Sequence, residues 1–523
     1  MKRSKVAGIQ LKSLIELKQY LLPLTMPTTL TTLTTTDGGG AIDLRSLNLP
    51  SSAIFIPMED VYGVEGACMT GPMQLEWMRQ LVMWYVREFT LHVDSKFKLH
   101  HGDWVLTSVG THHIRWDPHN LCLSNQFVPL VYLMCKQHES EGAGRLLLDA
   151  LNKVCVKYFG KKLEPGATMS DHAAGLKKAF VTVFPDVYHG QCWPHIIRKW
   201  GEGEWASKRW EHFDEVGTQL AAIHLAQTTM MRDLLMMEYG VMWDEWGHEM
   251  DVFWDSHCRP GKDGPNSGWD NWSIGCFDCV LCTPSQQAQE SWHKQLLTTK
   301  IPGLGKGSTE TVFHKMLPQL IEMDAIMIPT LLCFEVPGVP VEMVKKALWY
   351  VDNQNTHIHV FKHDGDDGAH GYYILRRDHE TGVTKITKRL IDMFRMAWQG
   401  DVDPRVQDLD HLVDICQGIH VVEEQQEGWP VPRCYLNPAQ LDCVGCKGFK
   451  SHGICSHVLA LNHILKATNL RREVMEIGKS GVGRQGGGNQ TKPVPALTRA
   501  PQREPDSSDE EEERLLALGA QGR

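Results

Sequence analysis

Three segments of the chain gather residue types that could carry out chemistry. The first, residues 170–200, opens with an acid, Asp171, placed between an extended run and a helical run. It closes with Cys192 and His195 in a C-x-x-H spacing at the start of a second helical run. Side chains three residues apart on a helix face the same way, so this pair could ligate a metal or form a buried polar pair.

The second segment is a run of cysteines before a helical stretch. Cys276, Cys279 and Cys282 lie in the run CFDCVLC, and His257 and Cys258 precede them. Part of this spacing is typical of a tetrahedral zinc site. Because a clear fourth ligand is missing from the pattern, we favour buried thiols on a strand.

The third segment, residues 434–464, resembles the SWIM zinc finger. That motif has a C-x-C pair, a short loop with an aromatic residue, and C-x-H before an apolar helix. The sequence CKGFKSHGICSHVLAL matches the second half of this motif. The first pair, Cys443 and Cys446, has C-x-x-C spacing where the motif has C-x-C. Cys434 is therefore an alternative candidate for the first ligand. Three thiolates and an imidazole suit a closed structural Zn²⁺ site. The implied ligands are Cys443, Cys446, Cys455 and His457.

Residues 170–200 also resemble a family signature, that of the Mutator-like (MULE) transposases, in which an aspartate at a strand end precedes "fPda.h..C..H". Two other stretches are similar to family motifs. HVDSKFKL matches "hvDgTfk" except at Ser95-Lys96, and TPSQQAQESWHKQLL matches "t.n.iEswh..lK". The resemblance implies a catalytic trio of acids, Asp94, Asp171 and Glu290.

The resemblance also implies a metal-dependent reaction at these acids. Cleavage and strand transfer at a phosphodiester need a nucleophile aligned with the leaving oxygen, and two divalent ions about 3.5–4 Å apart can stabilise both oxygens. Mg²⁺ or Mn²⁺ prefers oxygen ligands, so a few converging carboxylates suffice. Asp94 would bridge both ions, Asp171 would bind one, and Glu290 would bind the other.

The order of predicted elements favours a mixed α/β fold of the ribonuclease-H-like kind. Three successive strands, a helix and a further strand that ends before Asp171 are followed by helices, and a helix that begins at Thr283-Pro284 carries Glu290. The Trp- and Met-rich stretch 202–249 is helical in pattern and would be an insertion. The predicted elements are a helix over 74–89, two strands flanking a Gly102-Asp103 turn, a strand over 126–135, a helix over 144–159, an extended run over 167–170 and a helix over 172–180.

These patterns predict a chain of several segments. They are a low-complexity N-terminal segment (1–50), a transposase-like core (74–310, helical insertion about 202–282), a helical and β connecting region (311–416, with a hairpin turn at 364–368), a SWIM finger (417–465) and a disordered tail (466–523). A cysteine or histidine cluster does not precede Cys68, so we expect the N-terminal zinc module of many relatives to be absent or to lie outside this chain.

Composition limits the partners. The 523 residues carry a net charge of −10, so DNA binding would use local basic patches such as Lys447, Lys450 and His452 of the zinc loop, which could equally be solvated. Long uninterrupted apolar runs are missing from the sequence, so we expect no membrane span. The 15 cysteines in a long chain favour free thiols and metal ligands over disulfides.

The predicted function is that of a DNA transposase of Mutator-like type. It would bind double-stranded DNA at transposon ends in the nucleus, as a homo-oligomer that holds two ends together. The alternative is a domesticated, non-catalytic, zinc-dependent DNA-binding regulator. The intact acids argue for the enzyme, whereas Ser95-Lys96 and the missing N-terminal module argue for the regulator, so the sequence leaves enzymatic activity open.

Overall fold

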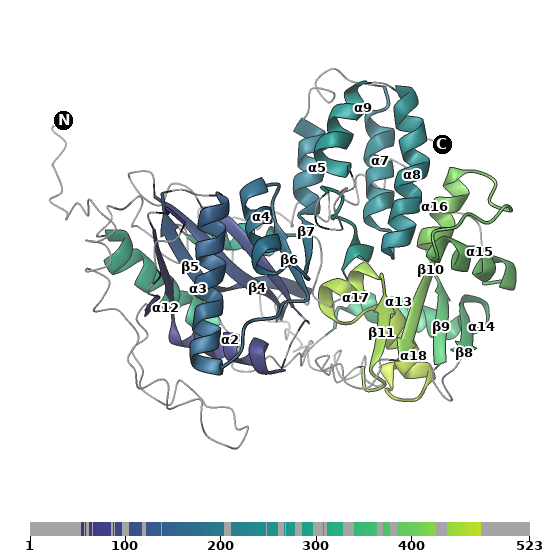
Figure 1. The fold of residues 1–523 in the computed structure, drawn as a ribbon. Helices are drawn as coiled ribbons and strands as arrows, with labels where there is room; N and C mark the ends of the chain where they lie inside the picture. The colour runs from purple at the N-terminus through teal and green to yellow at the C-terminus, as the bar shows by residue number, and fades with distance from the viewer. Residues whose placement is uncertain are drawn as a thin grey trace, which may run out of the picture.

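The protein has a mixed α/β architecture with two β-sheets and a group of helices between them in sequence (Figure 1). The computed structural model describes residues 54–471 with internal gaps. The longer gaps are 97–103, 203–210, 260–265, 278–284, 297–306, 328–338, 363–369, 377–384 and 425–436.

The first sheet has seven strands in the order β1-β2-β5-β4-β3-β6-β7. Strands β3, β4 and β5 form an antiparallel meander, and β6 and β7 then extend the sheet in parallel with β3. Parallel neighbours require crossover connections, which helices α3 and α4 provide. The strands are β1 Ile54–Ile56, β2 Gly66–Thr70, β3 Thr90–Lys96, β4 Val105–Asp117, β5 Cys122–Cys135, β6 Ala167–Ser170 and β7 Tyr188–Gln191.

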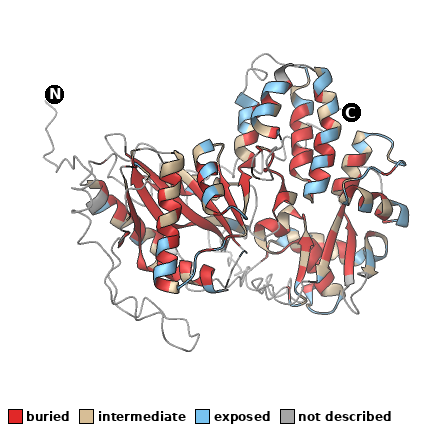
Figure 2. Ribbon diagram, viewed as in Figure 1, coloured by how far each residue is buried: buried red, intermediate tan, exposed pale blue. Residues whose placement is uncertain are grey.

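Helices cover both faces of this sheet, because its central strands are apolar on both sides. In β5, Val131 and Leu133 belong to the apolar cluster under α2 (Pro72–Trp84), α3 (Glu141–Phe159) and α4 (Ala174–Val183). Tyr132 and Met134 belong to the cluster on the other face, under α10 (Gln287–Gln295), η7 (Val312–Met316) and α12 (Leu317–Met327). This period-two division produces the buried central layer seen in Figure 2.

A group of helices follows β7. Its members are α5 Trp193–Glu202, α7 Phe213–His224, α8 Thr229–Trp246 and α9 His248–Phe253, followed by the short turns η4 Trp254–Cys258 and η5 Ile274–Cys276. Helices α7 and α8 fall in the stretch 202–249 that the sequence predicts as helical. The buried aromatic and aliphatic residues of the group form one cluster with the second sheet.

The second sheet is antiparallel, in the order β11-β10-β9-β8, with strands β8 Ile358–Lys362, β9 His370–Leu375, β10 Ile419–Glu424 and β11 Leu441–Val444. Tyr373 and Leu375 of β9 face the helical group, whereas Tyr372 and Ile374 belong to the opposite apolar cluster. The remaining helices are α13 Val341–Asp352, α14 Gln354–His357, α15 Lys388–Trp398, α16 Leu409–Gly418, α17 Lys447–His452 and α18 Ser456–Ile464.

The second sheet joins two segments that the sequence patterns separate. Strands β8 and β9 come from the connecting region 311–416, and β10 and β11 come from the predicted finger 417–465. The predicted hairpin is present as β8 and β9, although its turn at 364–368 lies outside the described residues. The finger therefore shares backbone hydrogen bonds with the region before it.

The helix that carries Glu290 begins later than predicted. Its first residue is Gln287, and Ser285 and Gln286 are not helical, so the expected start at Thr283-Pro284 is wrong. Tertiary hydrogen bonds explain the delay, because the Gln286 backbone N–H donates to the sulfur of Cys192 at 3.3 Å and its side chain donates to the Val93 carbonyl at 2.8 Å.

The sequence patterns do not predict some of the short strands. Strands β1, β2 and β7 have no counterpart among the predicted elements, since each is only three to five residues long. The segment 1–50 and residues 472–523 of the tail lie outside the described residues.

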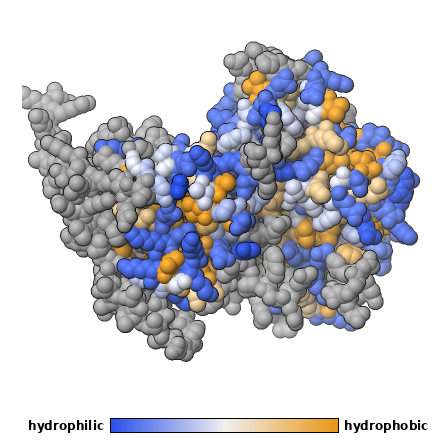
Figure 3. Space-filling view, in the orientation of Figure 1, coloured by the Kyte–Doolittle hydropathy of each residue, from blue (hydrophilic) through white to orange (hydrophobic). Residues whose placement is uncertain are grey.

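Among the described residues, no helix is both long and apolar enough to cross a membrane. In Figure 3, hydrophilic residues cover much of the described surface and apolar residues form smaller patches between them.

Candidate functional site

Strand pairing brings two of the predicted catalytic acids to the same edge of the first sheet. Strands β3 and β6 pair in parallel with Thr90 opposite Ala167 and His92 opposite Met169, an offset of 77 residues. Asp94 and Asp171 differ by the same 77 positions, so they continue this register at the carboxyl ends of the two strands. Their side chains therefore leave the sheet on the same face and close together.

The Asp94 carboxylate is held by one hydrogen bond and one close contact with a histidine. Its Oδ1 accepts from the Ser95 backbone N–H at 2.7 Å, and its Oδ2 lies 3.0 Å from Nδ1 of His293. The imidazole of His293 is nearly buried, with 5% of its side chain exposed. His293 lies one turn after Glu290 on α10, a spacing that could have pointed to it as a neighbour of the acids.

Asp171 lies in a position where burial and nearby negative charges disfavour its ionised form. Burial, together with the negative charges of Asp94, Glu139 and Glu290, raises the pKa of Asp171 to about 7. Its Oδ1 is buried and has no hydrogen-bond partner among the described residues. A carboxylate in this condition is a suitable ligand for a cation, because a positive charge would relieve both the repulsion and the burial.

Helix α10 delivers the third acid, and three glutamine contacts fix the helix against the sheet. Gln286 bonds to Val93 on β3, and the Gln289 amide donates to the Ser108 carbonyl and hydroxyl on β4, both at 3.1 Å. On the outer side, Trp292 Nε1 donates to Asp324 at 2.9 Å. These contacts aim Glu290 at the edge that bears the two aspartates.

The C-x-x-H pair lies against Glu290. Nε2 of His195 is 3.5 Å from Oε1 of Glu290, and Arg198, one turn along α5, is 3.5 Å from Oε2. The sulfur of Cys192 completes a group with these two residues in which one donor atom from each lies within 4.8 Å of the others. The C-x-x-H motif and the third acid therefore form one cluster.

Burial sets the protonation of this pair. It raises the pKa of the Cys192 thiol to about 12 and lowers the pKa of His195, which Glu290 opposes only in part. Without a cation nearby, Cys192 is a thiol and His195 a neutral imidazole at neutral pH. Both are the forms from which a metal site is made, the thiol by losing its proton.

The predicted zinc ligands also come together, at the end of the second sheet. Cys443 lies on β11, Cys446 precedes α17, and Cys455 and His457 begin α18. Their sulfurs lie 3.5, 3.7 and 3.7 Å from Nδ1 of His457, in that order. Zinc bonds of about 2.3 Å to sulfur and 2.05 Å to nitrogen at a tetrahedral angle place those atoms about 3.6 Å apart. These three sulfur-to-nitrogen distances are compatible with a tetrahedral zinc ion.

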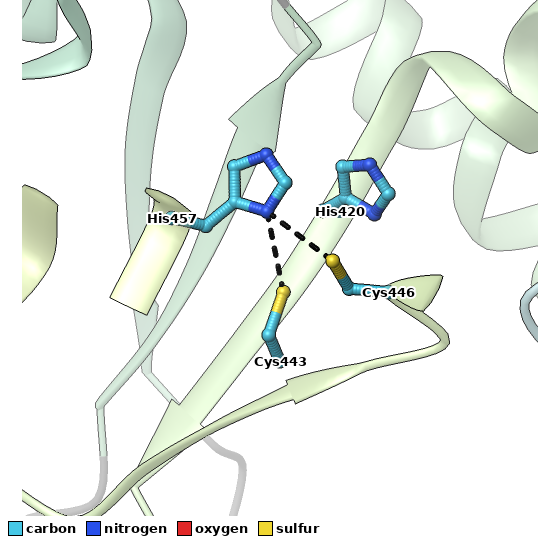
Figure 4. A group of neighbouring side chains, drawn as sticks. All are labelled: His420, Cys443, Cys446 and His457. Atoms are coloured by element: carbon cyan, nitrogen blue, oxygen red, sulfur yellow. Dashed lines mark hydrogen bonds between the residues drawn. The ribbon is translucent and has the colours of Figure 1, made fainter. Parts of the chain in front are cut away.

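A fifth donor, His420 on β10, was not predicted. Figure 4 shows it beside His457, with ring centroids 4.4 Å apart, and it groups with Cys443, Cys446 and His457 as a possible metal ligand. Strand pairing places it, since Val422 is opposite Cys443 and His420 lies two residues away on the same face. Burial lowers its pKa to about 3, so it is neutral and able to ligate. A histidine on an alternating strand was its only sequence signal.

The three thiols of this cluster have shifted pKa values. Burial raises the pKa of Cys443 and of Cys455 well above the ordinary range, whereas hydrogen bonds from these two neighbours hold the pKa of Cys446 well below it. A zinc ion would deprotonate all three. Cys434, the substitute first ligand, lies outside the described residues.

Two sequence interpretations around the finger need correction or completion. Lys450 is neither solvated nor free for phosphate, because it is buried and its ammonium donates to the Phe277 carbonyl at 2.6 Å. Cys276 is a buried thiol, as predicted, but it ends the turn η5 and does not lie on a strand. Its sulfur accepts from Arg232 at 2.8 Å, and it belongs to no metal group within the described part of the chain. Cys279 and Cys282 lie outside that part.

Comparison with known proteins adds no relative. The chain matches no protein-family model, and no curated protein matches it either.

Proposed function

We propose that the protein is a DNA transposase of Mutator-like type, or a nuclease derived from one. It would bind double-stranded DNA, cleave a phosphodiester with Mg²⁺ or Mn²⁺ held by Asp94, Asp171 and Glu290, and transfer the freed strand. The observation that carries the proposal is the convergence of these three acids, which are 77 and 119 residues apart in sequence, on one edge of a mixed sheet.

The strand order supports a ribonuclease-H-like core. An antiparallel meander β3-β4-β5, then a helix and two parallel strands on the other side of β3, is the arrangement expected of such a core. The first acid lies on the central strand and the second at the end of its parallel neighbour, as the family resemblance implies. The helical group between β7 and α10 would be the insertion expected before the third acid.

The chemistry would follow from the positions of the carboxylates. Divalent ions would neutralise the repulsion that raises the pKa of Asp171, and they would stabilise the charge on the attacking and leaving oxygens. His195 and Arg198 flank Glu290 and present cationic or hydrogen-bonding groups at the same edge, where they could contact a phosphate. Arg198 is about half exposed, with 46% of its side chain accessible.

The finger would provide structural support, with Zn²⁺ held by Cys443, Cys446, Cys455 and His457. Lys450 of its α17 donates to the carbonyl of Phe277, which precedes α10, so we propose that the zinc site helps to keep the segment before Glu290 in place. Holding two DNA ends together would require a homo-oligomer, and action on chromosomal DNA would place the protein in the nucleus.

The test is metal-dependent nicking of DNA that carries the candidate end sequence. We expect cleavage by the wild-type protein in Mg²⁺ or Mn²⁺, at least about 10³-fold weaker cleavage by Asp171→Asn, and full cleavage by Asp244→Asn, which removes an exposed acid on α8. Equal loss in both variants, or cleavage that persists in Asp171→Asn, would contradict the three-acid site.

A second candidate is a non-catalytic, zinc-dependent DNA-binding regulator. It is favoured by the contacts of Asp94 with the Ser95 backbone N–H and with His293, since these occupy both oxygens of this acid without a metal. DNA binding without cleavage by the wild-type protein, with zinc still bound, would support the regulator.

A further inference from the structure

We propose that Cys192, His195 and Glu290 form a second zinc-binding site, separate from the cluster around His457. The site would use one sulfur, one imidazole nitrogen and one carboxylate oxygen. It would leave a fourth position open to solvent. The inference goes beyond the proposed DNA reaction and does not depend on it.

The donor atoms have the spacing of a zinc site. One atom from each of the three residues lies within 4.8 Å of the others. The 3.5 Å between Nε2 of His195 and Oε1 of Glu290 is long for a hydrogen bond. Two such ligands on a tetrahedral zinc ion would be about 3.4 Å apart, whereas octahedral Mg²⁺ would draw them to about 2.9 Å. The gap therefore fits zinc better.

The carboxylate oxygen at the gap lacks another partner. Oε1 of Glu290 is buried and has no hydrogen-bond partner among the described residues. Buried polar atoms are seldom left unpaired, so an orphan carboxylate oxygen that faces an imidazole and a thiol points to a missing cation. Arg198 contacts the other oxygen, Oε2, and leaves Oε1 to the ion.

The backbone around Cys192 supports a metal-bound sulfur. Cys192 is fully buried, and its sulfur accepts the Gln286 backbone N–H at 3.3 Å. Such second-shell hydrogen bonds orient metal ligands and stabilise the thiolate. The same contact fixes the start of α10, so it also sets the distance from Cys192 to Glu290, one turn further along. His195 and Glu290 are each about one-fifth exposed, which gives the ion a route in and room for a water ligand.

A zinc ion here would engage the third acid. If the proposed DNA cleavage is correct, zinc bound at this site would withdraw Glu290 from Mg²⁺, and added zinc would inhibit cleavage. This consequence rests on the proposed function, whereas the existence of the site does not.

The experiment counts zinc in the full-length chain after loading with Zn²⁺ and removal of excess metal. We expect about two zinc ions per wild-type chain and about one in both Cys192→Ser and His195→Gln. The matched control is Cys155→Ser, which removes a buried thiol from α3 and should keep about two. Circular dichroism identifies variants that fail to fold, and the exposed edge of His195 makes His195→Gln the safer substitution.

Cobalt gives a second readout. Loading with Co²⁺ should produce sulfur-to-cobalt absorption from both sites, and Cys192→Ser should lose part of it while the finger's part remains. A wild-type chain that binds one zinc ion, lost only in Cys446→Ser, would overturn the proposal. So would a folded Cys192→Ser chain that still binds two. Neither outcome bears on DNA cleavage, so failure of this site and failure of the proposed function are distinguishable.

Discussion

The two clusters of potential metal ligands differ in how completely the protein encloses them. Cys443 is fully buried and His457 only 5% exposed, and their cluster is surrounded by β10, β11, α17 and α18. By contrast, Asp94 and Glu290 keep 17% and 21% of their side chains exposed at a sheet edge. A closed site of soft ligands suits a permanent structural ion, and an open site of carboxylates suits ions that exchange and act on a substrate.

The comparison also concerns electrostatics. In the acid cluster, like charges and burial raise the pKa of Asp171, so the protein holds a repulsive arrangement that a cation would relieve. In the thiol cluster, the neighbours share hydrogen bonds, and Cys446 is stabilised by the other two thiols. The difference teaches that the strands and helices around the acid cluster hold its side chains in place. The arrangement of the thiol cluster would depend on its own ligands and on the ion that they bind.

Breaking the closed site should have the largest effect. We expect Cys446→Ser, or removal of zinc by a chelator, to lower the free energy of unfolding by about 5 kcal/mol or more, because binding of a structural zinc ion is coupled to folding. The loss should extend to α13 and α18, since both belong to the apolar cluster that contains Cys443. Thermal unfolding measured by circular dichroism, with and without chelator, checks this. An unchanged melting temperature in a zinc-free protein would show that the cluster does not depend on an ion.

The contact between the finger and the helical group should give a smaller effect. Gly445 lies between two of the zinc ligands with φ of +69°, and a Cβ there would come 2.4 Å from Cβ of Gln227. Gln227 itself donates to the carbonyls of Cys416 and Ile419, so it cannot move away freely. We expect Gly445→Ala to destabilise the protein by about 1–3 kcal/mol.

Chemical denaturation measures this change, and Gly201→Ala, at a glycine with open space around it, is the matched control. Equal stability of the two variants would show that the finger and the helical group are not in close contact at this point.

The acid cluster should give the protein a pH-dependent stability and a pH-dependent affinity for Mg²⁺. Asp171 has a pKa of about 7 when folded, above its ordinary value of 3.8, so the metal-free protein loses stability as pH rises from about 4 to about 7. Mg²⁺ must displace that proton at lower pH. We therefore expect apparent Mg²⁺ affinity to fall about tenfold per pH unit below 7 and to level off above it.

Mg²⁺ titrations followed by melting temperature at several pH values check this prediction. The Asp171→Asn variant serves as the reference, since it lacks the titrating group and should show neither the slope in affinity nor the loss of metal-free stability. A wild-type protein with the same flat profile would place Asp171 outside the metal site.

The sequence by itself determined the local chemistry of this protein. It indicated the four finger ligands through their cysteine and histidine spacing, and it indicated the helical stretch after Trp200 and the strand before Asp171, because short-range periodicity reports which face of an element is buried. The strand over 167–170 coincides with β6.

Only the tertiary structure decided which distant groups meet. The parallel register of β3 and β6 set Asp94 beside Asp171, a pairing 77 residues apart that periodicity cannot specify. Hydrogen bonds from Gln286 to Cys192 and Val93 moved the start of α10 to Gln287 and placed Glu290 against His195. Strand pairing likewise brought His420 to the thiols. The physical reason is common to all three, because contacts between elements depend on packing over long sequence separations, where local propensity carries no information.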